Sequence, residues 1–301
     1  MIYEAHGLRI KTSIPFPEMG PPSDQNDNSY DVEVRKEKIY RDDAISNLER
    51  QKFSANKRYL DYAIPDIGYI RVKDNNEIII DKKGGPVNRT SRLFVLGIGL
   101  SILLYKRGRL VLHSSAVETK EGAVLFIGEK GAGKSTLAAT FASKNRSVIS
   151  DDIVDLCLDD KVNINSGVPS IKLWKDSLPI LEDESYTFEK AHEDLDKYIL
   201  MPKKVNKNSS FEVGGIFSIG FDKSISVRRT TPKESFSKLV RHSYLPKNLI
   251  KCLGAQKRHF HQCVRLSREV PMYHLNRPKD YSSSNEVLGL IESTLTKSKA
   301  S

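Results

Sequence analysis

The residues best suited to chemistry lie in one glycine-rich segment near the middle of the chain. Residues 128–135 read GEKGAGKS, which matches the pattern G-x-x-x-x-G-K-[ST] without a mismatch. Glycines in such a segment allow the backbone to wrap a phosphate chain with its N–H groups turned inward. The lysine then reaches the β- and γ-phosphates, and the hydroxyl reaches a Mg²⁺ ion. The pattern therefore predicts a site for a nucleoside triphosphate with magnesium.

The sequence on both sides of this segment supports the prediction. An apolar run, AVLFI over 123–127, precedes it and indicates a strand, and an alanine-rich run over 135–144 follows and indicates a helix. The alternative, a glycine-rich turn that only happens to precede a helix, leaves this combination unexplained. We expect Lys134 to act in phosphoryl transfer and Ser135 to bind Mg²⁺. The residues predicted to bind the cofactor ATP are Gly128, Glu129, Lys130, Gly131, Ala132, Gly133, Lys134, Ser135 and Thr136.

Two neighbouring carboxylates follow the predicted helix. Residues 146–152 read RSVISDD, a short β-branched strand that ends in Asp151 and Asp152, and Asp151 comes 17 positions after Lys134. This distance suffices for one helix and a return, so we expect the strand to lie beside the phosphate-loop strand, with its carboxyl end at the nucleotide. One carboxylate could hold Mg²⁺ while the other accepts a proton from an attacking hydroxyl. Both carboxylates can serve only if the chain leaves the strand between them. The alternative to a catalytic pair is that the two residues form a helix cap or a turn.

His113 is the third candidate for the site. It lies in LVLHSSAVE, within a strand predicted over 109–117, and a polar turn at 119–122 joins that strand to the phosphate-loop strand. A lone histidine on an apolar strand is commonly a buried structural residue. The hairpin, however, brings the end of the strand that carries His113 close to the phosphate loop.

The elements around these residues predict an α/β chain with two domains. Short strands are expected in the first part, over 2–10, 30–34, 59–63, 69–72 and 77–80, followed by a connector over 82–88. An apolar helix over 90–105 then leads into strands that alternate with a helix. Further strands are expected near 155–158, 214–220, 224–228 and 272–275, and helices near 233–242, 247–256 and 284–296. We therefore predict a small β-rich domain over 1–89 and an α/β phosphate-loop domain over 90–301.

Composition narrows the class of protein. The longest apolar run, residues 94–105, is well short of the roughly 20 residues needed to span a bilayer, so no membrane partner is expected. Three irregularly spaced cysteines and an N-terminus without signal-peptide features predict a reducing, cytoplasmic location. The net charge of +10 suits an anionic partner. Nucleic acid is disfavoured because aromatic residues interleave with basic ones only at 259–261. A homo-oligomer remains open.

Three of these segments together resemble a known family. LHSSAV (112–117), GEKGAGKST (128–136) and VISDDIVDL (148–156) resemble the C-terminal catalytic domain of HPr kinase/phosphorylase, which shares its phosphate loop and fold features with phosphoenolpyruvate carboxykinase. Further segments are similar to the kinases that accompany lasso-peptide biosynthesis and phosphorylate the C-terminal Ser of the precursor peptide. They are the opening YEAHGLRIKTSIPFPE (3–18), SGVPSIKLWKDSL (166–178), YILMPKK (198–204) and VGGIFSIG (213–220).

The resemblance implies a phosphate-loop kinase core that uses ATP and Mg²⁺ on a ribosomal precursor peptide ending in Ser. It implies Asp151 as the general base, Asp152 as a metal or hydroxyl-positioning ligand, and His113 as a supporting group near the transferred phosphate. The chain departs from HPr kinase/phosphorylase in lacking an R-G-x-G segment after the Asp pair. HPr as the acceptor and the reverse reaction are therefore not implied.

Two weaker signals and two other functions stay open. Trp174 could line the acceptor pocket or lie in the core, and Lys203 and Lys204 could reach phosphate oxygens or simply face solvent. The same kinase core would serve a small metabolite or an HPr-like protein as acceptor. A protein of another class, in which ATP only switches a basic binding surface, also fits the phosphate loop.

Overall fold

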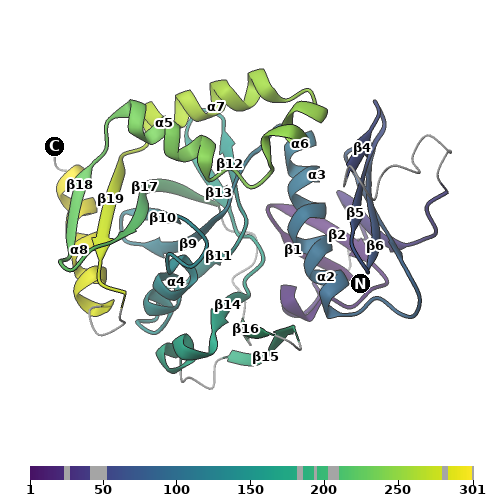
Figure 1. The fold of residues 1–301 in the computed structure, drawn as a ribbon, viewed down its shortest axis with the longest axis horizontal. Helices are drawn as coiled ribbons and strands as arrows, with labels where there is room; N and C mark the ends of the chain where they lie inside the picture. The colour runs from purple at the N-terminus through teal and green to yellow at the C-terminus, as the bar shows by residue number, and fades with distance from the viewer. Residues whose placement is uncertain are drawn as a thin grey trace.

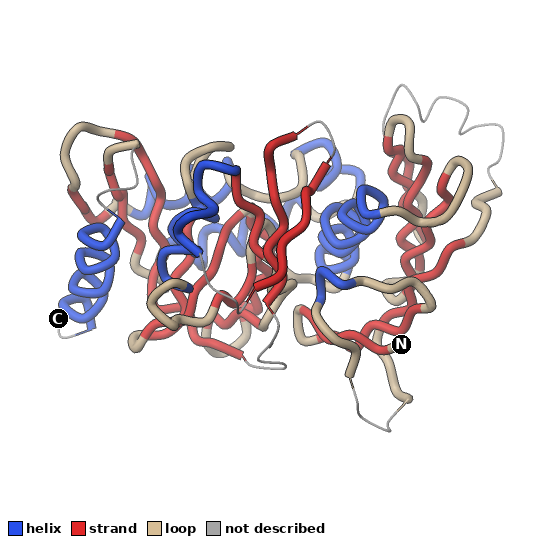
Figure 2. The backbone as a smooth tube through the Cα atoms, turned by 90° about the horizontal axis from the view of Figure 1, so that it is seen from below, coloured by secondary structure: helices blue, strands red, loops and turns tan. Residues whose placement is uncertain are grey.

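The computed structural model describes residues 1–23, 28–40, 53–181, 186–192, 195–202, 210–279 and 284–299. The chain is a mixed α/β protein, and its N-terminal sheet lies at one end of an elongated molecule (Figures 1 and 2). A second group of sheets, with helices on both faces, forms the other end. Among the described residues, no helix is long and apolar enough to cross a membrane.

The N-terminal sheet contains the short strands that the sequence predicts, with a difference at its start and an additional strand, β4, that was not predicted. The strand expected over 2–10 is a hairpin, because His6 and Gly7 adopt positive φ values of 57° and 63°, as a two-residue hairpin turn of type I′ requires. Within the described chain the sheet has the order β1-β2-β3-β7-β6-β5-β4. Its strands are β1 (Ile2–Ala5), β2 (Leu8–Thr12), β3 (Val32–Lys36), β4 (Phe53–Ala55), β5 (Tyr59–Ile64), β6 (Gly68–Lys73) and β7 (Glu77–Lys82).

The apolar helix expected over 90–105 is confirmed and packs on this sheet. It consists of α2 (Arg89–Phe94), a π-helical stretch (Val95–Gly99) and α3 (Leu100–Lys106). The Asn88 side chain caps it by accepting a hydrogen bond from the Ser91 N–H at 3.0 Å. Leu100 and Leu103 share one buried cluster with Ile70 of β6 and with Leu249, which lies far along the chain. The core is therefore continuous across the predicted domain boundary at residue 89.

A larger sheet carries the phosphate-loop strand, β10. Its order in the described chain is β11-β9-β10-β17-β13-β12-β8, with β19 pairing to β17 and β18. Helices α4 and α8 cover one face, and α5 and α7 cover the other (Figure 1). The strands are β8 (Leu110–Leu112), β9 (Ser114–Thr119), β10 (Gly122–Ile127), β11 (Val148–Ser150), β12 (Val154–Leu158), β13 (Val162–Asn165), β17 (Ser210–Phe221), β18 (Ser226–Arg229) and β19 (Met272–Arg277). The helices are α4 (Lys134–Ala142), α5 (Pro232–Arg241), α6 (Lys247–Cys252), α7 (Gln256–Glu269) and α8 (Ser284–Lys299).

Two strand predictions near the site are wrong in detail. The strand expected over 109–117 breaks at His113, so that β8 pairs with β12 while β9 pairs with β10. The strand that leads to Asp151 is β11, and it pairs with β9 rather than with β10. The tight β9–β10 hairpin already occupies that edge of β10. Two antiparallel steps restore the strand direction, so the carboxyl ends of β11 and β10 still lie at the same edge of the sheet.

A small sheet that the sequence did not predict covers the side of α4. It consists of β14 (Ile171–Trp174), β15 (Tyr186–His192) and β16 (Leu195–Pro202), in the order β14-β16-β15. Ile171 and Leu173 point inward and pack with Leu200 against Ala139 of α4. The alternate residues of β14 therefore point away from this core. This alternation places the side chains of Lys172 and Trp174 beside the phosphate loop.

Candidate functional site

The phosphate-loop segment joins β10 to α4, as the sequence predicts. Gly131 and Gly133 have φ values of 85° and 88°, a backbone region that favours glycine. A Cβ atom at position 133 would lie only 2.0 Å from Nη2 of Arg277, so a larger residue would displace that guanidinium as well as strain the backbone. Gly133 precedes the first turn of α4, and no side chain caps that end of the helix. The first N–H groups of α4 are thus free of a side-chain cap, as an anion site at a helix start requires.

Lys134 is held inside the loop. Its side chain is buried, and Nζ donates hydrogen bonds to the carbonyl oxygens of Gly128 at 2.9 Å and Glu129 at 3.2 Å. Burial lowers the pKa of Lys134, while the charges of Asp151 and Asp152 oppose that shift. The ammonium group is therefore fixed within the loop that it is expected to serve, facing the two carboxylates.

Asp151 connects three elements of the site. It follows the last residue of β11 and is only 6% exposed. One carboxylate oxygen accepts hydrogen bonds from Ser135 Oγ at 2.9 Å and Ser115 Oγ at 2.5 Å. The other oxygen accepts the backbone N–H of Lys172 at 2.9 Å. Both oxygens of Asp151 are thus already engaged, and one of them orients the Ser135 hydroxyl.

Asp152 has a different environment. Its φ of 77° shows that the chain turns out of the strand at this point, so the two carboxylates do not simply alternate across the sheet. Lys172 Nζ lies 2.6 Å from Oδ2, and His113 Nδ1 lies 3.1 Å from Oδ1. Burial alone would raise the pKa of Asp152, but the charge of Lys172 and the hydrogen bond from His113 hold it well below its ordinary value. Asp152 is therefore ionised at neutral pH, and its side chain remains 26% exposed.

His113 lies in the break between β8 and β9 rather than within a strand. Its backbone N–H donates to the carbonyl oxygen of His242 at 2.8 Å, which fixes the break. Burial lowers the pKa of His242 to about 4, so that this neighbouring ring is neutral at neutral pH. The structure thus places His113 in one cavity with the phosphate loop, as the hairpin predicts, and also against Asp152, but in a break between strands rather than within one.

These groups surround one cavity of about 360 Å³. Most of the residues predicted from the sequence line it together: His113, Lys130, Gly131, Gly133, Lys134, Ser135, Thr136, Asp151 and Asp152. Gly128, Glu129 and Ala132 do not line it. Gly128 instead supplies a carbonyl oxygen to Lys134, and the Glu129 carboxylate pairs with Arg241 at 2.7 Å.

The cavity also contains residues that the sequence analysis missed. They are Lys172 and Leu173 of β14, Lys197 of β16, and Phe221, Arg277 and Lys279 near the ends of β17 and β19. Trp174 lines the cavity as well and is 44% exposed, so the alternative of a core tryptophan is wrong. The alternation of apolar and polar residues in IKLW would have indicated a half-buried strand with Lys172 and Trp174 on one face. Lys203 and Lys204 lie outside the described residues.

The cavity has two chemically different sides. On the side of β17 and β19, Phe221 is 42% exposed, and the cationic groups of Arg277 and Lys279 lie 5.4 and 5.5 Å from its ring centre. On the side of β14 and β16, Trp174 and Lys197 are cross-strand neighbours, beside the Lys172–Asp152 ion pair. The phosphate loop lies between these two sides, because β10 separates β17 from β9 and β11, and Lys172 joins β14 to Asp152 just after β11.

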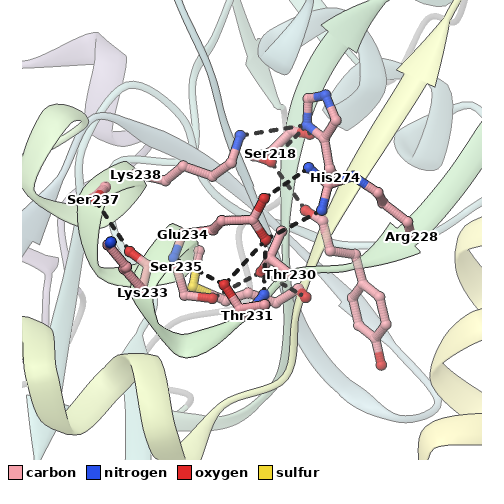
Figure 3. Close-up of polar contacts among 12 residues, drawn as sticks. Ser218, Arg228, Thr230, Thr231, Lys233, Glu234, Ser235, Ser237, Lys238 and His274 are labelled. Carbon is pink, nitrogen blue, oxygen red and sulfur yellow. Dashed lines mark hydrogen bonds and ion pairs between the residues drawn. The ribbon is translucent and has the colours of Figure 1, made fainter.

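A polar cluster outside the cavity holds α5 on the sheet (Figure 3). Thr231 and Glu234 form a capping box at the start of α5, and Arg228 pairs with Glu234 at 3.0 Å. On β19, His274 Nδ1 lies 3.0 Å from Ser218 Oγ of the neighbouring strand.

This cluster fixes the helix that reaches the phosphate loop. Lys238 of α5 extends to His274, with 3.5 Å between Nζ and Nδ1. Three residues further on, Arg241 ends α5 and makes the ion pair with Glu129 of the loop. The cluster is thus linked through one helix to the rim of the site.

Comparisons with known proteins leave the chain without a family. No known family matches the sequence, and no curated protein does. Among solved structures, the Hpr(Ser) kinase/phosphatase from Coxiella burnetii is similar, with a TM-score of 0.33 and 13% sequence identity. The match covers 63% of this chain and 98% of that one. A likeness of this size does not assign a family.

Proposed function

We propose that this protein is a kinase that transfers the γ-phosphoryl group of ATP to a hydroxyl acceptor. The observation that carries the proposal is the hydrogen bond from Ser135 Oγ to Asp151 at 2.9 Å, with Asp152 beside it in the same cavity. A phosphate loop with an adjacent carboxylate pair supplies the charge neutralisation, the metal ligands and the proton acceptor that phosphoryl transfer needs.

The residues around Ser135 fit a magnesium ion. Its hydroxyl and the Asp151 carboxylate supply the oxygen ligands that Mg²⁺ prefers, either directly or through water. Magnesium, when bound there, would offset the negative charge of the phosphate oxygens. The loop N–H groups and Lys134 would hold the phosphates in line with the acceptor.

The contacts favour a division of roles between the two aspartates that reverses the one implied by the family resemblance. Asp151 has both oxygens engaged and orients Ser135, which suits the metal side. Asp152 keeps an exposed edge in the cavity, which suits the acceptor side. Its carboxylate takes the hydroxyl proton as the acceptor oxygen bonds to the γ-phosphorus and the bond to the ADP oxygen breaks. His113 and Lys172 hold that carboxylate in place.

The acceptor proposed here is the C-terminal Ser of a ribosomal precursor peptide. The support for it is the similarity of the segments quoted above to lasso-peptide precursor kinases. The exposed Trp174 offers an apolar wall for a peptide at the cavity.

A panel of acceptors tests the proposal. The purified chain would be incubated with γ-labelled ATP and Mg²⁺, and with peptides that end in Ser, peptides that end in Ala, free Ser and HPr. We expect label in the Ser-ended peptides, none in the Ala-ended peptides, and none in any acceptor after addition of EDTA. ATP hydrolysis with no acceptor labelled would contradict the proposal and favour a nucleotide-switched binding protein.

A further inference from the structure

Lys197 is a cation in the cavity for which the described residues supply no anionic partner. Within the described chain, its ammonium group makes no hydrogen bond and no ion pair, and Nζ lies 5.8 Å from the centre of the Trp174 ring. Two other cations of the cavity, Lys172 and Lys134, are engaged. Lys172 pairs with Asp152 at 2.6 Å, and Lys134 donates to two loop carbonyl oxygens.

The strand register fixes Lys197 and Trp174 as one unit. They lie opposite each other in the β14–β16 pair, so their side chains are cross-strand neighbours at the cavity. The charged groups that act on Lys197 are Lys172, Asp152, Asp151 and Lys130. Burial and the charge of Lys172 lower the pKa of Lys197, which means that its positive charge is under-compensated. An anionic group placed beside the Lys197 ammonium would compensate this positive charge.

We propose that Lys197 and Trp174 form a subsite for a carboxylate of the acceptor, next to the hydroxyl that is phosphorylated. This inference rests on the proposed kinase function and adds Lys197 as the residue that selects the acceptor. The geometry favours the acceptor over the nucleotide, because Lys197 lies on the side of Asp152, whereas Phe221, Arg277 and Lys279 lie on the opposite side of the loop. Trp174 would cover the apolar part of the residue that carries the carboxylate.

Three peptides of otherwise identical sequence locate the carboxylate. One ends in Ser with a free carboxylate, one ends in Ser amide, and one ends in Ser amide with Asp immediately before it. We expect the full-length protein to prefer the free acid over the plain amide by about 10- to 100-fold in kcat/KM, the usual worth of a hydrogen bond to a charged group. If the Asp peptide regains this preference, the subsite reads a side-chain carboxylate as well, and if it does not, the terminal carboxylate is the one recognised.

Variants separate this subsite from a contact with ATP. Lys197→Met should abolish the preference for the acid by raising KM for the acid peptide, with KM for ATP unchanged, and Lys197→Arg should restore part of it. Lys190→Met is the matched control, since Lys190 lies in the same small sheet and pairs with Asp196 away from the cavity. An unchanged acid-to-amide ratio in Lys197→Met, or a raised KM for ATP alone, would overturn the inference.

A binding measurement keeps this inference separate from the proposed reaction. Trp174 is the only tryptophan of the chain, so its fluorescence reports on the subsite without any phosphoryl transfer. In the presence of Mg²⁺ and ADP, the acid peptide should change this fluorescence at concentrations about 10-fold or more below those needed for the amide. Equal titrations for acid and amide overturn the subsite even if the kinase is active. A clear preference supports the subsite even if no peptide is labelled.

Discussion

At the scale of single residues, the first prediction concerns the buried ammonium group of Lys134. Its contacts are with loop carbonyl oxygens rather than with the apolar core, so its loss should affect charge more than packing. Lys134→Ala should lower phosphoryl transfer by about 100-fold or more, because a preorganised charge at the transferring group is lost. Transfer of label from ATP measures this loss, and thermal unfolding checks that the fold persists. Lys144→Ala, at an exposed position just after α4, is the control, and a folded Lys134→Ala protein with normal transfer would refute the assignment.

The Lys172–Asp152 pair predicts a shift in the pH profile. Lys172 helps to hold the pKa of Asp152 well below its ordinary value, whereas burial acts in the opposite direction. A base works only when ionised, so activity falls as pH falls through this pKa, and in the wild type this limb lies below the ordinary value of about 3.9. Lys172→Met removes the positive charge and leaves burial, so the acid limb of kcat/KM should move to higher pH.

Lys172→Arg, which keeps the charge, is the matched control and should leave the limb near its wild-type position. The measurement is kcat/KM across pH for all three proteins. An acid limb at the same pH in Lys172→Met would show that Asp152 is not the base.

The sequence predicted some residues of the site and not others, for a physical reason. Lys134, Ser135 and the aspartates lie within one strand–loop–helix–strand unit, so their spacing along the chain reflects their spacing in space. Lys172 and Lys197 reach the same cavity from a separate sheet whose place depends on packing against α4. No local pattern encodes that contact.

At the scale of elements, the β1–β2 hairpin is tied to the larger sheet by one buried residue. His6 lies at the hairpin turn, is 0% exposed, and its Nδ1 lies 2.6 Å from Oδ1 of Asp155 on β12. Its backbone N–H also donates to the carbonyl oxygen of Ser166. Arg109 reaches the other oxygen of Asp155 at 2.5 Å. This network joins the N-terminal sheet to the strands behind Asp151 and Asp152.

His6→Ala should therefore destabilise the whole fold. Asp155 stays paired with Arg109 in this variant, but one of its buried oxygens loses its hydrogen-bond partner, which costs about 1–3 kcal/mol in free energy of unfolding. Urea unfolding measures this cost. Lys11→Ala on the same hairpin is the control, because its partner Glu33 lies 3.8 Å away at the surface and such a pair contributes about 0–1 kcal/mol. A loss in His6→Ala no larger than in this control would show that the hairpin contact is not structural.

Elements that follow from a local periodic pattern of apolar residues were predicted correctly, whereas the order in which strands pair was not. The apolar helix before the phosphate loop and strands such as β6 and β7 follow from local patterns. The placement of β11 beside β9 depends on a hairpin that occupies one edge of β10, which sequence spacing does not reveal. Helix α7 was missed because Gln256–Glu269 is highly polar and only a narrow face is buried, including Cys263 and Leu266.

At the scale of the whole molecule, the net charge bears on which ligands the cavity attracts, and the continuous core bears on how the two ends of the molecule are joined. The net charge of +10 is reflected in the cavity, where lysines and Arg277 outnumber Asp151 and Asp152. Such a cavity attracts anionic substrates, and a nucleotide together with an anionic acceptor would balance its positive charge.

The core runs without interruption from the N-terminal sheet through α3 to α6, so a chain that starts near residue 90 would expose a large apolar face. Point variants such as His6→Ala are therefore the better test of what the N-terminal sheet contributes.

The central claim is that the cavity transfers phosphate with Asp152 as the base and Asp151 on the metal side. Its most direct test is single-turnover transfer of label from ATP to a Ser-ended peptide by the wild type, Asp151→Asn and Asp152→Asn, with Mg·ATP affinity measured in parallel. Asp152→Asn should bind Mg·ATP normally and transfer about 10²- to 10⁴-fold more slowly, the usual worth of general-base catalysis. Asp151→Asn should lose Mg²⁺-dependent nucleotide affinity as well. Transfer at the wild-type rate by Asp152→Asn, or ATP consumed by the wild type with the peptide unlabelled, would contradict the claim.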